Sequence, residues 1–227
     1  MDMLATPEFW LGLGKIIWIN IILSGDNAVV IALAARSLRP DQQRKAIFWG
    51  TAAAVILRIA LTVVAVKLMA MPWLQIVGGL LLLYIGVQLL SENSDDEGEA
   101  KEHGSLGAAI RTILIADLVM SLDNVIGVAA AANGNMVLLI IGLAIAIPIV
   151  IFGSTLMIRV MERFPIIITL GAALIGWVGA ETIVSDSVLS PWFPSHTLPY
   201  YMAATVGAAF VVALGTWLQK GSVKATA

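Results

Sequence analysis

The sequence reads Ser-Gly-Asp-Asn at residues 24–27 and Ser-Leu-Asp-Asn at residues 121–124, and each stretch lies inside a long apolar segment. We call them the first and the second motif. A carboxylate in the hydrocarbon of a membrane is energetically costly and rarely occurs without a function. Because this cost occurs twice in matching surroundings, the motifs predict two related halves that each supply oxygen ligands to one shared site within a membrane.

The composition is that of a membrane protein. Of 227 residues, 59% are hydrophobic and 12% are charged, whereas soluble domains have about 25% charged residues. A soluble core of this size cannot hide that apolar excess, so most of it is expected to face a lipid bilayer. The net charge of −2 argues against a nucleic-acid partner. The absence of cysteine excludes disulfides, thiolate metal sites and thiol catalysis.

The lengths of the apolar segments predict an all-α membrane protein with seven transmembrane helices. A helix that crosses a bilayer needs about 20 mostly apolar residues. Seven segments meet this need, the third of them being short: 10–35, 46–70, 73–90, 109–132, 136–158, 165–184 and 199–219.

The basic residues predict the orientation, because cytoplasmic loops carry an excess of Lys and Arg. One side of the expected membrane carries ten of them and the other side only Lys67, with Lys15 and Arg58 inside spans. We therefore expect a multi-pass membrane protein with its N-terminus outside and its C-terminus in the cytoplasm. The ten are Arg36, Arg39, Arg44, Lys45, Lys101, Arg111, Arg159, Arg163, Lys220 and Lys224.

The two halves align without gaps around the motifs, residues 16–35 on residues 113–132, so Ile16 falls on Ile113 and Asn20 on Asp117. Span two matches span five more weakly, with Gly50 opposite Gly142. Three spans separate the motifs, so the halves cross the membrane in opposite directions. We expect a 3+3 inverted repeat plus one C-terminal helix. Its parts are a first repeat at 1–90, an acidic cytoplasmic loop at 91–108, a second repeat at 109–185, and a loop, seventh helix and tail at 186–227.

The motif side chains offer oxygen ligands only, which hard divalent cations such as Mn²⁺, Mg²⁺ and Ca²⁺ prefer. Binding sites in inverted repeats lie near the membrane midplane, where broken helices expose carbonyl groups, and Gly25 would ease such a break. A competing interpretation is that these side chains join helices by hydrogen bonds. Arg58, deep in span two, is expected to neutralise an intramembrane acid. The candidate metal ligands are Asp26, Asn27, Asp123, Asn124, Asp117, Asn20, Ser24, Ser121 and Glu181.

Residues 24–36 and 117–125 resemble the two signature motifs of the TerC family of integral membrane proteins, and the similarity extends over the whole chain. That family is linked to tellurite resistance by name and to Mn²⁺ export by function. The resemblance implies a bacterial cytoplasmic-membrane protein that exports Mn²⁺ as its substrate, with the motif acids as ligands. Some members have an acid where this chain has Asn20, which would make the Asp117 side dominant.

Other functions remain open at this point. The chain could export another cation or a small amino acid, as in the related lysine-exporter superfamily, although the anionic motifs would hold only the ammonium group. It could also be a non-transporting membrane partner that binds metal and assists other proteins. An enzyme is the least expected, because no nucleophile–base pair or nucleotide motif is visible, and we expect no organic cofactor.

Overall fold

The computed structural model describes residues 7–23, 25–69, 71–91, 105–132 and 136–225, and within these ranges α-helices joined by turns and loops make up the chain, with no β-strand. Helix propensity and continuous apolar runs account for this, because a backbone in hydrocarbon must satisfy its hydrogen bonds internally. The helices are α1 (Pro7–Leu23), α2 (Gly25–Ala35), α3 (Pro40–Met69), α4 (Leu74–Ser91), α5 (Leu106–Ala132), α6 (Met136–Arg163), α7 (Ile166–Ser185) and α8 (Leu198–Ala225).

Five helices contain a stretch that is long and apolar enough to cross a membrane, judged on the described residues. Those stretches confirm an integral membrane protein with several apolar helices, while the count of seven crossings stays a prediction. Large apolar side chains such as Trp18, Phe152 and Trp217 are more than half exposed, as expected for surfaces that face lipid. The stretches are Pro40–Thr62, Leu74–Ser91, Ile140–Arg163, Ile166–Ser185 and Leu198–Lys220.

The first expected span contains two described helical stretches, α1 to Leu23 and α2 from Gly25, and Ser24 between them lies outside the described residues. The corresponding helix α5 continues through Leu122 without interruption.

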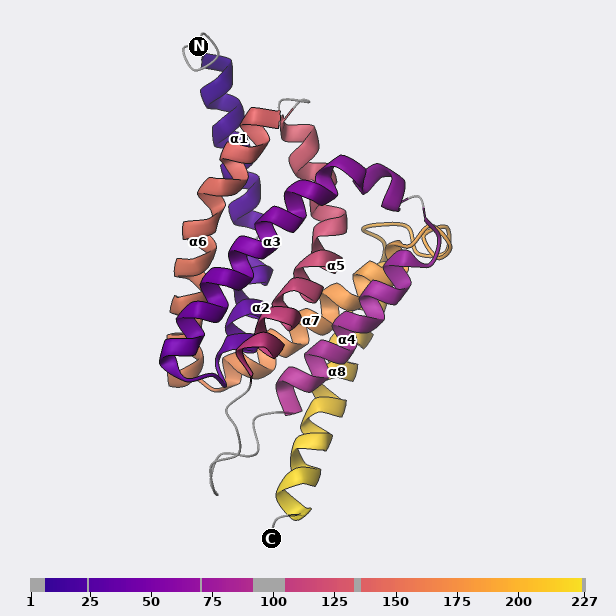
Figure 1. Cartoon of the computed structure of the whole chain (residues 1–227). Helices are drawn as coiled ribbons and strands as arrows, with labels where there is room; N and C mark the ends of the chain where they lie inside the picture. The colour runs from indigo at the N-terminus through magenta and orange to yellow at the C-terminus, as the bar shows by residue number, and fades with distance from the viewer. Residues whose placement is uncertain (1–6, 24, 70, 92–104, 133–135, 226–227) are drawn as a thin grey trace.

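The helices form two groups (Figure 1). α4, α7 and α8 pack against one another, while α3 packs on α5, and α6 packs on both α1 and α2. Eight of the eleven residues of α2 are buried, because α3, α5, α6 and α7 all contact it. The short helix that carries the first motif therefore lies inside the protein.

Two close helix contacts correspond to each other in the proposed halves. A Cβ atom on Gly50 of α3 would lie 2.9 Å from Cδ1 of Ile113 on α5. A Cβ atom on Gly142 of α6 would collide with Ile16 on α1. Since the alignment pairs Gly50 with Gly142 and Ile113 with Ile16, corresponding residues make both contacts. This supports the repeat, and the inverted repeat itself stays a prediction.

Candidate functional site

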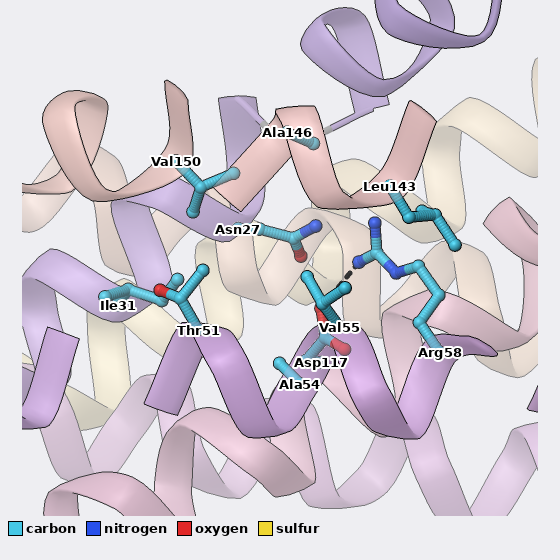
Figure 2. A pocket seen from close by; sticks show the side chains of 10 residues that line it. All are labelled: Asn27, Ile31, Thr51, Ala54, Val55, Arg58, Asp117, Leu143, Ala146 and Val150. Atoms are coloured by element: carbon cyan, nitrogen blue, oxygen red, sulfur yellow. Dashed lines mark hydrogen bonds and ion pairs between the residues drawn. The ribbon is translucent and has the colours of Figure 1, made fainter. Parts of the chain in front are cut away.

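A small cavity lies where the two halves meet, between α2, α3, α5 and α6 (Figure 2). The cavity has a volume of about 20 Å³, which is room for about one water molecule or one desolvated ion. Its lining is mostly apolar and contains four polar side chains. The lining residues are Asn27, Ile31, Thr51, Ala54, Val55, Arg58, Asp117, Leu143, Ala146 and Val150.

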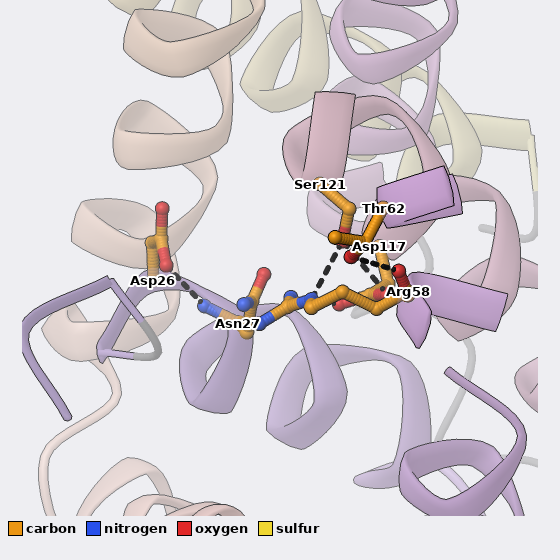
Figure 3. Close-up of polar contacts among 6 residues, drawn as sticks. All are labelled: Asp26, Asn27, Arg58, Thr62, Asp117 and Ser121. Atoms are coloured by element: carbon orange, nitrogen blue, oxygen red, sulfur yellow. Dashed lines mark hydrogen bonds and ion pairs between the residues drawn. The ribbon is translucent and has the colours of Figure 1, made fainter. Parts of the chain in front are cut away.

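The strongest polar contact at the cavity is an ion pair between α3 and α5 (Figure 3). Arg58 Nη2 donates to Asp117 Oδ1 at 2.5 Å, and Arg58 Nε donates to Ser121 Oγ at 2.9 Å. The Ser121 hydroxyl in turn donates to Asp117 Oδ2 at 3.1 Å. The three side chains thus form a closed ring of hydrogen bonds, with Asp117 and Ser121 one helical turn apart on α5.

The ring is buried, which makes its charge balance important. Arg58 is 5% exposed, Asp117 is 7% exposed and Ser121 is fully buried. Removing one partner of such a pair typically costs about 3–5 kcal/mol, because the other charge is left uncompensated. Arg58 was expected to neutralise an acid, and the structure pairs it with Asp117. The negative charge that was expected to make the Asp117 side dominant is therefore already balanced within the protein.

The first motif contributes Asn27 to the cavity. Figure 2 shows its amide extending from α2 toward the guanidinium of Arg58 and toward Asp117. Asp26 does not line the cavity. It is half-buried in the first turn of α2, where its Oδ1 accepts the backbone N–H of Asn27 at 2.7 Å. Figure 3 shows Asn27 between Asp26 and the Arg58–Asp117 pair. The carboxylate of Asp26 therefore lies next to the cavity lining, one residue before Asn27.

Thr51 was not among the residues that the sequence pointed to. It is 2% exposed and lines the cavity, and its hydroxyl has no hydrogen-bond partner in the described part of the chain. In contrast, Thr62 Oγ1 donates to the carbonyl of Arg58, one turn earlier on the same helix. Threonine populates two χ1 rotamers in helices, so the hydroxyl can turn toward an occupant. The sequence feature that could have indicated Thr51 is its i, i+7 spacing from Arg58, which puts both residues on one helix face.

The structure brings only some of the candidate ligands together. Asn27 and Asp117 line the cavity, Ser121 is hydrogen-bonded to Asp117, and Asp26 adjoins Asn27. Asn124 and Glu181 are half-buried on α5 and α7 and are not part of the lining. Among the described residues, no three His, Cys, Asp or Glu are grouped to hold a metal ion. The side chains of Asn20 and Asp123, and all of Ser24, lie outside the described structure.

Asp186 is a second buried acid that the sequence did not reveal. It follows α7, and its carboxylate accepts the backbone N–H groups of Trp73 and Gln75, both at 3.2 Å, and of Val188 at 3.0 Å. Trp73 immediately precedes α4 and has a φ of 71°, a conformation that usually costs a non-glycine residue about 1–3 kcal/mol. Asp186 thus caps the start of α4 from the far half of the chain, and its role is structural.

The same chain organisation occurs in other membrane proteins. The profile described as "Integral membrane protein TerC family" matches residues 5–223. The uncharacterized membrane protein YjbE of Bacillus subtilis (strain 168) is 43% identical over 213 residues, which cover 94% of this chain and 97% of YjbE.

Two more distant relatives are inner membrane proteins by name. The UPF0053 inner membrane protein YoaE of Escherichia coli (strain K12) is 26% identical over 231 residues, which cover 93% of this chain but 43% of YoaE. The UPF0053 inner membrane protein YgdQ of the same strain is 25% identical over 200 residues, covering 81% of this chain and 84% of YgdQ. No solved structure matches the chain.

Proposed function

Because the chain belongs to the TerC family of integral membrane proteins, we propose that it is a secondary transporter that exports Mn²⁺ or a similar hard divalent cation. One observation carries this proposal: Asn27 next to the first motif's acid and Asp117 of the second half line the same buried cavity. Two polar segments that are far apart in the sequence therefore converge on a space of ionic size. If the polar side chains only joined helices by hydrogen bonds, a cavity between them would not be required.

The chemistry of the lining fits a hard cation. The described oxygen donors are the Asn27 amide, the Thr51 hydroxyl and the Asp117 carboxylate, which are ligand types that Mn²⁺ and Mg²⁺ accept. Asp26 lies directly beside Asn27 and adds negative charge next to the proposed site. Asp123 stays a candidate ligand from the sequence, because its side chain lies outside the described structure.

We further propose that the C-terminus is cytoplasmic and the N-terminus is outside. In support, the start of α1 and the end of α8 lie at opposite ends of the bundle (Figure 1). The starts of α3 and α5 share one end with the ends of α2, α6 and α8, and most of the ten basic residues belong to these segments. A reporter fused after residue 227 is expected to be active in the cytoplasm. A C-terminal reporter that is active only outside the membrane would refute this orientation.

A second candidate substrate is a small amino acid. The guanidinium of Arg58 in the cavity could hold a carboxylate, which the motifs alone could not do. Room for about one water molecule is too little for an amino acid in this conformation. We therefore prefer the ion, and a transport assay with competing amino acids distinguishes the two.

Efflux from liposomes tests the proposal directly. Purified protein is reconstituted into vesicles loaded with Mn²⁺, and release is followed with an external metal-sensitive dye against protein-free vesicles. We expect protein-dependent release that other hard divalent cations inhibit and amino acids do not. Metal binding without any release would instead favour the non-transporting membrane partner, and release blocked only by amino acids would favour the second substrate.

A further inference from the structure

We propose that Arg58 acts as a built-in counter-cation, which holds Asp117 while the site is empty and is displaced from it when the metal ion binds. This inference rests on the proposed function, because it assigns Arg58 a part in the transport cycle. Membership in the family does not assign this part to Arg58. The inference concerns how the empty site is neutralised, not which ion is carried.

The geometry shows a competition for one carboxylate. Arg58 occupies Oδ1 of Asp117, and the Ser121 hydroxyl occupies Oδ2. The guanidinium lines the same cavity as Asn27 and Thr51, and space for about one water-sized occupant remains with it in place. An ion in that space that takes Oδ1 of Asp117 as a ligand must replace Arg58 at that oxygen.

The electrostatics point the same way. Among the residues that the structure describes, the charged side chains that line the cavity are Arg58 and Asp117, and their charges cancel. A divalent cation beside a guanidinium would be repelled strongly at the low dielectric of a buried site. Moving Arg58 off Asp117 removes that repulsion and releases a carboxylate at the same time. Binding is therefore expected to exchange an internal cation for the external one.

This exchange would serve the return step of the cycle. A transporter must reorient with its site empty, and an uncompensated buried carboxylate makes that conformation costly. With Arg58 on Asp117 this carboxylate is compensated in the empty site. Net export needs this empty return, whereas exchange of Mn²⁺ for Mn²⁺ across the membrane does not. The two transport modes should consequently respond differently to loss of the Arg58 charge.

The test compares Arg58→Gln with the wild type in Mn²⁺ binding, in net Mn²⁺ efflux and in exchange of radioactive Mn²⁺ for unlabelled Mn²⁺. We expect the variant to bind Mn²⁺ ~10-fold more tightly, within the usual range of coupling between competing groups. We expect net efflux to fall ~10-fold or more while exchange remains within about threefold of the wild type. Arg39→Gln is the matched control, because Arg39 pairs with Asp41 on the exposed surface.

Two further variants keep the test decisive if Arg58→Gln does not fold. Arg58→Lys keeps the charge but loses the planar contact with both partners, so we expect modestly tighter Mn²⁺ binding and a smaller loss of net efflux than an uncharged residue would cause. Arg58→Gln combined with Asp117→Asn removes both charges, and we expect this variant to bind Mn²⁺ no more tightly than the wild type. Weaker Mn²⁺ binding in Arg58→Lys, or equal loss of exchange and net efflux in a folded variant, would overturn the counter-cation. A wild type that carries no Mn²⁺ would instead refute the proposed function.

Discussion

Replacing Asp26 with asparagine is expected to reduce Mn²⁺ export by ~100-fold or more, since even groups that only support a metal ligand typically change affinity by 10–100-fold. The reason is the charge balance at the cavity. Arg58 neutralises the negative charge of Asp117. The negative charge that remains available near Asn27 is therefore that of Asp26, in the first turn of α2. Asparagine has nearly the same shape and removes only that charge. The measurement is Mn²⁺ efflux from liposomes at equal amounts of inserted protein.

Asp41→Asn is the matched control for this prediction. Asp41 also lies in the first turn of a helix, α3, but it is exposed and paired with Arg39 outside the cavity. The control should export Mn²⁺ at the wild-type rate. Should Asp26→Asn and Asp41→Asn export equally well, Asp26 would not belong to the transport site.

Replacing Asp186 with alanine is expected to destabilise the protein by about 3 kcal/mol without a direct effect on metal binding. Its carboxylate accepts three backbone N–H groups that include those of Trp73 and Gln75 at the start of α4. Hydrogen bonds to a charged group contribute about 1.5–3 kcal/mol each, and the orphaned N–H groups add a desolvation cost. The effects are not additive, so we expect a total below the sum of the three individual bonds. Unfolding in detergent measures the change in free energy.

Two variants test whether the loss of stability comes from the hydrogen bonds of the Asp186 carboxylate or from any substitution in this loop. Asp186→Asn keeps one acceptor oxygen and should lose about half as much stability. Ser187→Ala changes the exposed neighbour and should stay within ~0.5 kcal/mol of the wild type. A stability of Asp186→Ala that matches Ser187→Ala would show that the cap does not hold α4 in place.

The helices could be predicted well from the sequence, because apolar length is a strong signal in a membrane protein. Each of the seven expected segments overlaps the helices observed. The first segment holds α1 and α2, and Ser24 between them lies outside the described residues, so the break that Gly25 suggested stays a prediction. The uninterrupted course of α5 agrees with Leu122 at the equivalent position.

The site was predicted only in part. The sequence identified Asn27 and Asp117 as site candidates and Arg58 as the partner of some acid. It could not identify which acid, because Arg58 and Asp117 are 59 positions apart and their pairing depends on how α3 packs on α5. Asp186 was missed for a related reason. Its partners lie 111 and 113 positions away, and one polar residue after a helix gives no local indication of them.

The location of bound Mn²⁺ tests the shared site most directly. Crystals of the wild-type protein grown with Mn²⁺ would give an anomalous scattering peak for the ion. We predict one peak inside the cavity, with an oxygen of Asp117 and an oxygen from Asp26 or Asn27 at about 2.2 Å, the range of a hard cation and its ligands. A peak outside the cavity, with the cavity unoccupied and Arg58 still on Asp117, would contradict a site shared by the two motifs.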